Sequence, residues 1–263
     1  MNNNTSIVVE HVNKTFRLQH HRTLKQVAMA AVRGQRISTT FNAVNDVSFS
    51  VEQGESVGLM GLNGSGKSTL LKMINGVMRP DGGSVLTRGR IAGLIATGAG
   101  FQSQLSGADN IYLNAAILGL SERETKSIYD DIVEFAELGQ FLDQPVGTYS
   151  SGMSARLGFS IAVHVKCDIF LADEVLAVGD KPFKTKCLAK MEEIRDSGTT
   201  IFYVSHAAAS VSRMCKRVLV LEKGNLVFDG EADAGIEFLH YGPDPGEEVT
   251  EEEFEDSELG ADI

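Results

Sequence analysis

The sequence predicts an α/β fold with an antiparallel β subdomain and an inserted helical subdomain. A short apolar run at 55–60 leads into a glycine-rich loop. Two further apolar runs, at 168–172 and 199–204, are typical of fully buried parallel strands. The segment between 102 and 165 shows helical periodicity instead. Apolar runs on either side of 223–225 predict a β-hairpin near the C-terminal end of the fold.

The N-terminal part alternates apolar and polar residues. Segments 7–9 and 47–51 have the period of half-buried antiparallel strands. After the glycine-rich loop, a helix is predicted from Lys67 to about Asn75, and Gly76 should close it. The Asp-Gly-Gly sequence at 81–83 predicts a turn.

The central part is predicted to be a helical subdomain over about 103–165. Asn110 is the expected cap of a helix that runs through Leu118. Ser121 and Glu124 have the spacing of a capping box. The helix that follows should bury one apolar face, formed by Ile128, Ile132, Phe135 and Leu138. A further helix is expected to begin near Met153.

The negative charge of the chain is concentrated at its C-terminal end. The net charge is −11, but residues 231–263 carry 13 acidic residues and no lysine or arginine. Residues 1–230 therefore have a net charge of +2. This pattern predicts one globular domain over 1–240 and an acidic, disordered tail over 241–263. A net charge of +2 spread over the domain predicts no nucleic-acid partner.

No apolar run is long enough to span a bilayer, and residues 1–10 lack the pattern of a signal peptide. We therefore expect a cytoplasmic chain whose contact with a membrane is made through a partner.

The glycine-rich loop matches a phosphate-binding motif. The sequence Gly-Leu-Asn-Gly-Ser-Gly-Lys-Ser-Thr at 61–69 fits G-x-x-x-x-G-K-[ST] and lies between a predicted strand and a predicted helix. Successive backbone N–H groups of such a loop point at phosphate oxygens, and the helix N-terminus adds partial positive charge. The residues predicted to bind ATP are Gly61, Asn63, Gly64, Ser65, Gly66, Lys67, Ser68 and Thr69. Lys67 should reach the β- and γ-phosphates, and the Ser68 hydroxyl should be a ligand of Mg²⁺.

Two carboxylates follow the apolar strand at 169–172. Asp173 stands where an acidic residue holds Mg²⁺ in such proteins, directly or through a water molecule. Glu174 comes next and would point elsewhere, so it is free to polarise a water molecule. Taken alone, an Asp-Glu pair after a strand is more often a helix cap, so this prediction depends on the loop at 61–69.

A Tyr-Ser-Ser-Gly-Met segment at 149–153 completes a set of motifs that resembles the ABC ATPase family over about residues 5–230. In that family this signature segment closes on the γ-phosphate of ATP held by the opposite subunit, so the resemblance implies a homodimer. Ser150 and Gly152 match the family pattern. Ser151 stands where the family usually has Gly, and Met153 stands where it usually has Gln.

Four more residues take roles from the same resemblance. Gln102 resembles the glutamine that senses Mg²⁺ and the attacking water, and Asp180 resembles the D-loop aspartate. His206 resembles the switch histidine that follows a strand. Phe16 looks like the aromatic residue that stacks on adenine, although a core aromatic is an alternative. The implied reaction is ATP hydrolysis with Glu174 as the general base or water orienter, assisted by His206 and Gln102.

Three segments narrow the resemblance to the polysaccharide-export branch of the family. They are the signature at 149–153, the stretch 98–107 and the stretch 173–180. Residues 107–110 depart from the usual Gly-Arg-Glu-Asn of that branch. The branch implies a separate pair of transmembrane permease subunits, a lipid-linked polysaccharide handled by the complex, and a place on the cytoplasmic side of the membrane. The chain most resembles galactan exporter subunits of actinobacteria.

An insertion at about 19–42 is another trait of this branch. It contains a capping box at 23–26, four basic residues and no acidic one. This composition predicts a short basic amphipathic helix, which either meets the membrane or permease or packs on its own domain.

Two other functions remain open on the sequence. One is the ATPase of an ABC importer, which would use the same residues. The other is an ABC ATPase that acts on ribosomes or DNA without a permease. Ribosomal members have two cassettes and DNA-repair members have a long coiled coil, whereas this chain shows one cassette and no sustained heptads.

Overall fold

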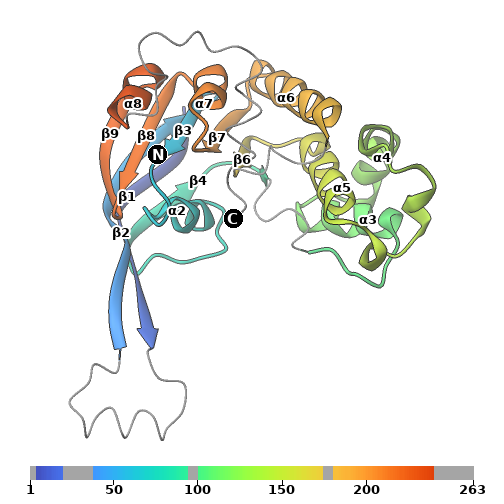
Figure 1. The fold of residues 1–263 in the computed structure, drawn as a ribbon, viewed down its shortest axis with the longest axis horizontal. Helices are drawn as coiled ribbons and strands as arrows, with labels where there is room; N and C mark the ends of the chain where they lie inside the picture. Colours follow the sequence, from blue (N-terminus) through green and yellow to red (C-terminus); the bar gives the residue numbers. More distant parts are fainter. Residues whose placement is uncertain (1–3, 20–37, 94–99, 174–179, 240–263) are drawn as a thin grey trace, which may run out of the picture.

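The computed structural model describes residues 4–19, 38–93, 100–173 and 180–239. These residues form two β-sheets with helices around them and a separate group of helices to one side (Figure 1). Most of the predicted insertion, the residue Glu174 and the predicted tail at 241–263 lie outside the described residues. The two ends of the segment 19–42 are β-strand.

The smaller sheet has three antiparallel strands in the order β2-β1-β4. They are β1 (Thr5–Gln19), β2 (Ser38–Glu52) and β4 (Gly82–Thr87). The predicted alternation is confirmed, because Ile7 lies opposite Val51 and Val9 lies opposite Phe49. The far halves of β1 and β2 form a long two-stranded ribbon that projects from the body (Figure 1).

The predicted turn at 81–83 is wrong, because β4 begins at Gly82. Gly82 pairs with Asn13 of β1, and Gly83 has φ 78. A Cβ atom on Gly83 would lie 2.2 Å from the His11 carbonyl oxygen. The glycines therefore permit a close approach of two strands rather than a reversal of the chain.

The larger sheet has six strands in the order β5-β6-β7-β3-β8-β9, and all neighbours are parallel except β8 and β9. The strands are β3 (Ser56–Met60), β5 (Ile91–Gly93), β6 (Ile169–Ala172), β7 (Thr200–Val204), β8 (Arg217–Glu222) and β9 (Asn225–Glu231). Every residue of β6 and β7 is buried, as predicted for parallel strands. The predicted hairpin is the pair β8 and β9.

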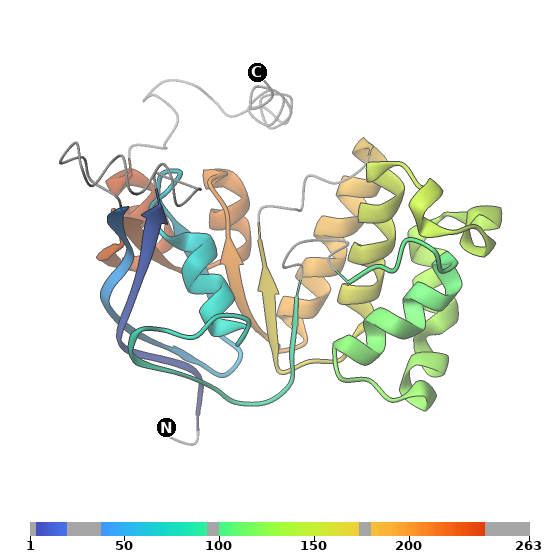
Figure 2. The ribbon, with the colours of Figure 1, turned by 90° about the horizontal axis from the view of Figure 1, so that it is seen from below.

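Apolar cores cover both faces of the larger sheet. Helix α2 (Lys67–Ile74) packs between the two sheets, where Leu70 and Leu71 meet side chains such as Leu59 and Phe202. The opposite face is covered by α6 (Lys181–Asp196), α7 (Ala208–Met214), α8 (Ala232–Phe238) and part of α5 (Ser151–His164). Figure 2 shows α2 beside the antiparallel strands and the long helices on the other side. These layers fix the ends of β3, β6 and β7.

The helices at one side are α3 (Gly107–Ile117), α4 (Glu122–Ala136) and α5, joined by the short 3-10 helices η1 (Gly139–Asp143) and η2 (Val146–Thr148). They share a core that includes Ile111, Ile132 and Leu157. The capping box of Ser121 and Glu124 is present as predicted. The predicted cap at Asn110 is wrong, because the Ser106 hydroxyl caps α3 by accepting from the Asp109 N–H at 3.1 Å.

None of the helices in the described parts of the chain combines the length and the apolar character needed to cross a membrane.

Candidate functional site

The site lies where three neighbouring strands of the larger sheet end. In the order β6-β7-β3, Asp173 follows β6, His206 follows β7 and the loop 61–66 follows β3. The carboxyl edge of an open parallel sheet is where α/β proteins bind ligands. An open cavity of about 200 Å³ lies there. Its lining residues are Phe16, Phe41, Ala43, Asn63, Gly64, Ser65, Gly66, Lys67, Ser68, Thr69 and Asp173.

The loop 61–66 has a shape that only glycine permits at two close contacts. Gly61 and Gly66 have φ 140 and φ 110. A Cβ atom on Gly61 would lie 2.1 Å from the Leu221 carbonyl oxygen, and one on Gly66 would lie 2.1 Å from the Ala43 carbonyl oxygen. The loop is thus pressed between β8 and β2, and neither contact leaves room for a side chain.

A third contact fixes the loop from the turn between β8 and β9. The Gly224 N–H donates to the Ser65 carbonyl oxygen at 2.9 Å, and the Gly224 carbonyl accepts from the Asn45 N–H at 2.8 Å. One residue of this turn therefore connects the loop to strand β2. Contacts with β2, β8 and this turn together hold the loop in place.

The polar groups of the loop fit a polyphosphate. The Lys67 side chain is buried and folds back over the loop, where its Nζ donates to the Gly61 carbonyl at 2.6 Å. The Ser65 Oγ is also buried, and no group among the described residues hydrogen-bonds to it. A buried hydroxyl without a partner is costly unless a ligand satisfies it. The N-terminus of α2, which begins at Lys67, adds partial positive charge at the same place.

Ser68 and Asp173 both line the cavity, one from α2 and one from the end of β6. A hydroxyl and a carboxylate are hard oxygen ligands of the kind that Mg²⁺ takes in phosphate-binding sites. The residues present therefore fit a magnesium ion between the loop and β6. Glu174, the predicted base, lies outside the described residues.

Phe16 is half-buried and lines the cavity, so it is not the core aromatic that was its alternative. The Lys14 Nζ lies 5.8 Å from the centre of its ring. Phe41 lies opposite Phe16 on β2 and lines the same cavity, but sequence reasoning missed it. It fell inside the predicted insertion at 19–42, and only the pairing of β1 with β2 places it opposite Phe16. A strand predicted through residue 41 would have indicated that Phe41 lies opposite Phe16.

Gln102 and His206 are not among the residues that line the cavity. Both are exposed. The backbone of Gln102 is held by Asn110, whose Oδ1 accepts from the Gln102 N–H at 2.8 Å and whose Nδ2 donates to the Gln102 carbonyl at 3.1 Å. The Asn110 side chain is fully buried. Asn110 therefore anchors the segment that carries Gln102. Sequence reasoning had assigned Asn110 a different role, as a helix cap.

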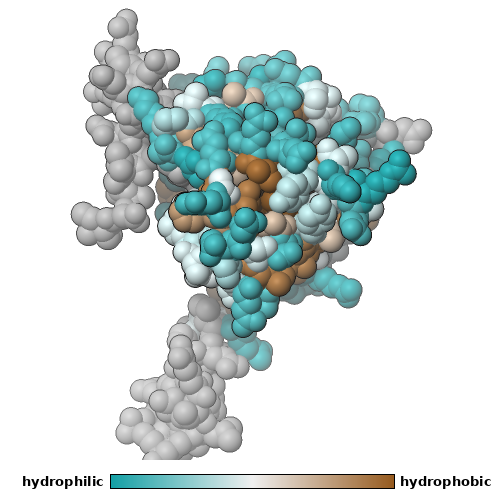
Figure 3. Space-filling view, turned by 90° about the vertical axis from the view of Figure 1, so that its right-hand side faces the viewer, coloured by the Kyte–Doolittle hydropathy of each residue, from teal (hydrophilic) through white to brown (hydrophobic). Residues whose placement is uncertain are grey.

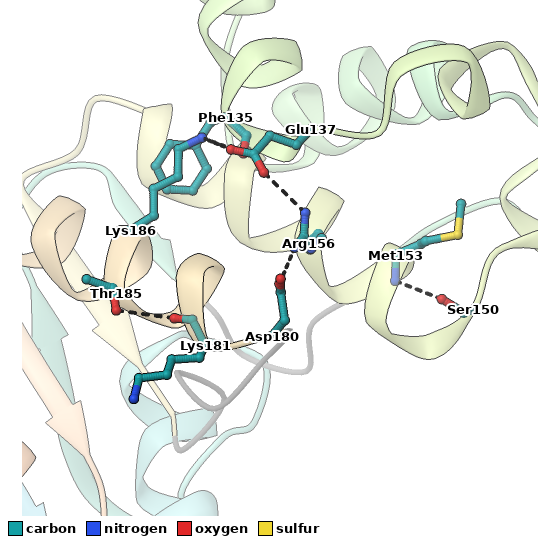
Figure 4. Close-up of polar contacts among 9 residues, drawn as sticks. All are labelled: Phe135, Glu137, Ser150, Met153, Arg156, Asp180, Lys181, Thr185 and Lys186. Atoms are coloured by element: carbon teal, nitrogen blue, oxygen red, sulfur yellow. Dashed lines mark hydrogen bonds and ion pairs between the residues drawn. The ribbon is translucent and has the colours of Figure 1, made fainter. Parts of the chain in front are cut away.

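The signature segment forms the N-terminus of α5. The Ser150 Oγ accepts from the Met153 N–H at 3.2 Å and so caps the helix (Figure 4). The four residues predicted to act in the partner's site are Ser150, Ser151, Gly152 and Met153, and the cavity of their own chain is not lined by any of them. Their backbone N–H groups lie at the N-terminus of α5, outside the cavity formed by the loop 61–66.

Arg156 lies one turn further along α5 and contacts three other parts of the chain. It forms ion pairs with Asp180, which precedes α6, and with Glu137, which follows α4 (Figure 4). Its guanidinium also lies 4.4 Å from the centre of the Phe183 ring. A hydrogen bond from Lys186 holds the pKa of the Glu137 carboxyl below its ordinary value. Asp180, at the start of α6, is thus tied to the signature helix.

The sequence matches the family model described as ABC transporter over residues 44–177. It is 44% identical over 230 residues to the O-antigen export system ATP-binding protein RfbB of Klebsiella pneumoniae, covering 86% of this chain and 94% of that protein. It is 45% identical over 235 residues to the teichoic acids export ATP-binding protein TagH of Lactococcus lactis subsp. lactis, covering 89% of this chain and 50% of that protein.

The fold is similar to that of a solved ATP-binding cassette, described as a dimeric post-hydrolysis state bound to ADP and phosphate. The TM-score is 0.68 at 20% identity, and the match covers 86% of this chain and 98% of that chain.

Proposed function

Because this chain belongs to the ABC transporter family, we propose that it is the ATP-hydrolysing subunit of an exporter of lipid-linked polysaccharide. The family match and the phosphate-binding geometry of the loop 61–66 support the ATPase part of this proposal. The names of the relatives support the export part, because one is an ATP-binding protein of an O-antigen export system and the other is a teichoic acids export ATP-binding protein. Galactan is the polymer that the sequence resemblance favours.

In this proposal the cavity holds ATP. The backbone N–H groups of the loop bind the phosphates, and Lys67 turns from its carbonyl partner toward the β- and γ-phosphates. Phe16 contacts the adenine base. Ser68 and Asp173 hold Mg²⁺, with Asp173 acting directly or through a water molecule. When bound, the ion supplies positive charge against the phosphate oxygens.

Hydrolysis transfers the γ-phosphoryl group to water. The water oxygen forms a bond to the γ-phosphorus, the bond from that phosphorus to the β–γ bridging oxygen breaks, and ADP leaves. Glu174 orients the water and accepts its proton. Gln102 and His206 complete the site when the cavity closes on the nucleotide.

The active form in this proposal is a homodimer. Ser150, Ser151, Gly152 and Met153 of one subunit close on the γ-phosphate in the partner, and Asp180 lies beside the same interface. The position of the α5 N-terminus, away from its own cavity, supports a role in another subunit's site. Backbone N–H groups at a helix N-terminus favour an anion.

A pair of transmembrane permease subunits is the second partner that we propose. The helical group at one side exposes large apolar side chains, which are Tyr112 and Ile117 of α3, Leu105 before α3 and Phe141 of η1. Figure 3 shows apolar side chains gathered on this side of the molecule, with polar residues around them. Contiguous apolar surface of this kind is typical of protein interfaces. The chain would then lie on the cytoplasmic side of the membrane, held there by the permease.

Two variants test the ATPase proposal on the purified full chain. Lys67→Ala should abolish ATP binding, whereas Lys72→Ala, which removes an exposed lysine further along α2, should bind ATP normally. Glu174→Gln should bind ATP, stall hydrolysis and accumulate as a dimer on light scattering. Hydrolysis at the wild-type rate by Lys67→Ala would refute the site, and the same result for Glu174→Gln would refute the base.

The export proposal is tested in cells that lack the native gene. Lipid-linked polysaccharide should accumulate on the cytoplasmic side, and wild-type chain should clear it when its permease is present. Glu174→Gln should fail to clear it. Normal surface polysaccharide in the deletion strain would instead favour the importer function or the function without a permease.

A further inference from the structure

Two phenylalanine side chains line the cavity from neighbouring strands. Phe16 of β1 and Phe41 of β2 are direct partners in the antiparallel register. Directly opposite residues of an antiparallel pair project from the same face, with Cβ atoms about 4.5–5.5 Å apart. Both residues line the cavity with the loop 61–66. The ribbon therefore presents two rings, rather than one, to whatever occupies the cavity.

The position of Phe41 relative to the loop is fixed by close contacts. Ala43, two residues further along β2, is buried and touches Gly66 with its carbonyl oxygen. The same strand is held at Asn45 by the Gly224 carbonyl. On the ribbon, the Thr15 hydroxyl donates to the Asn42 Oδ1 at 3.0 Å. A short piece of β2 thus connects Phe41 to the phosphate-binding loop. This piece is held by the contacts of Asn42, Ala43 and Asn45.

Phe16 is held in its place by Asp81. One carboxylate oxygen of Asp81 accepts from the Thr15 N–H at 2.8 Å, and the other accepts from the Lys14 Nζ at 2.7 Å. That ammonium group is the one near the Phe16 ring. These contacts lock β1 at the residue before Phe16. Phe41 is more exposed than the half-buried Phe16, because 44% of its surface is exposed.

We propose that Phe41 is a second aromatic contact for the base of the bound nucleotide, beside Phe16. This inference rests on the proposed nucleotide site. The exposed Phe41 lines the cavity beside Phe16, on strands other than the loop that takes the phosphates, and a nucleoside attached to those phosphates would meet these strands. Stacking of a base on an aromatic ring tolerates different bases, because every base has a π-face. Phe41 therefore contributes affinity for the nucleoside rather than for the phosphates.

The test compares two ligands that share a diphosphate, namely ADP and inorganic pyrophosphate, on the purified full chain. Phe41→Ala should raise the Kd of ADP about tenfold, as expected for loss of one base-stacking ring. The Kd of pyrophosphate should change less than about twofold. Phe41→Tyr keeps the ring and should bind ADP like the wild type. Phe238→Ala is the matched control, because it removes a phenyl ring of similar exposure from the end of α8.

The possible results separate this inference from the proposed function. Unchanged ADP binding by Phe41→Ala overturns the inference, and so does an equal loss for ADP and pyrophosphate, which would mean that Phe41 only supports the ribbon. Either result leaves the phosphate site intact. Lys67→Ala should weaken both ligands strongly. If it weakens neither, the proposed site is refuted, whatever Phe41→Ala does.

Discussion

Arg156 of α5 and Asp180 at the start of α6 form an ion pair within one chain. The guanidinium also lies over the Phe183 ring, so it contacts the first turn of α6 at two points. Asp180 ends the segment that begins at Glu174, the proposed base. The start of α6, six residues after Glu174 in the sequence, is therefore coupled to the helix that carries Ser150, the proposed contact to the partner's nucleotide.

Arg156→Ala should lower the rate of ATP hydrolysis severalfold and have only a small effect on the free energy of unfolding. The ion pair is partly exposed and contributes about 0.5 kcal/mol, and the cation–π contact contributes about 0.5–1 kcal/mol. We expect a loss of about 1 kcal/mol in the free energy of unfolding by urea titration. The kcat of ATP hydrolysis should fall severalfold while the Kd of ADP is unchanged.

A double-mutant cycle checks whether Asp180 is the partner that matters. Arg156→Ala and Asp180→Ala should be non-additive in kcat, because either change removes the same pair. Arg156→Ala combined with Glu192→Ala, on a residue paired with Arg213 instead, should be additive. Additive effects for both combinations would show that the ion pair has no part in turnover.

Gly66→Ala should destabilise the chain far more than Gly76→Ala. Both glycines have positive φ, at 110 and 74, so both substitutions strain the backbone. A Cβ atom on Gly66 would also strike the Ala43 carbonyl at 2.1 Å, whereas no atom lies within 4 Å of one on Gly76. We expect Gly76→Ala to cost about 1 kcal/mol and Gly66→Ala at least about 3 kcal/mol in urea unfolding. Equal losses of unfolding free energy for the two variants would mean that β2 moves freely away from residue 66.

Asn110→Ala should destabilise the chain by about 2–4 kcal/mol. Its side chain is fully buried, and removing it leaves the Gln102 N–H without its acceptor. It also donates to the Leu105 and Ser106 carbonyls. Asn114→Ala is the control, because that side chain is only half-buried and donates one bond, to the Asn110 carbonyl. We expect a thermal shift several times larger for Asn110→Ala, and similar shifts for the two variants would contradict the prediction.

The capping box of α4 should make stability depend on acid pH. Hydrogen bonds from the Ser121 backbone, then from its hydroxyl, and then from Arg90 lower the pKa of Glu124 from 4.5 to about 2. A carboxyl with a lowered pKa stabilises the fold above its ordinary pKa, and this contribution is lost as pH falls from about 4.5 toward 2. Glu124→Gln should therefore melt below the wild type at pH 7, and the two melting temperatures should converge near pH 2. A constant difference across this range would exclude a role of the charge.

Local patterns in the sequence predicted the parts of the fold that depend on neighbouring residues. The loop 61–66 lies between a strand and a helix, as its motif requires. The Ser121 and Glu124 capping box spans one turn, so its spacing alone determines the contact. The exact start of α3 was not predicted, because Ser106 and Asn110 are both good caps and the pattern cannot rank them. Burial decided the outcome, since Asn110 is drawn inside to bond Gln102.

Contacts between distant segments could not be predicted in this way. Phe41 meets Phe16 only through the pairing of two strands, and the residues between those strands carry a helical pattern that hid the strand. Arg156 meets Asp180 and Glu137 because three helices pack together, and no spacing along the chain indicates these pairs. The motifs located the site, and the tertiary packing determined which additional residues surround it.

The contact between Gly224 and Ser65 has a consequence for the order in which the chain matures on the ribosome. The loop 61–66 leaves the exit tunnel early, but the turn that braces it is translated near the end of the domain. Ribosome-bound intermediates that stop before residue 224 should therefore fail to retain nucleotide, even though every residue of the motif has been made. The capacity to bind ATP would therefore arise late in translation.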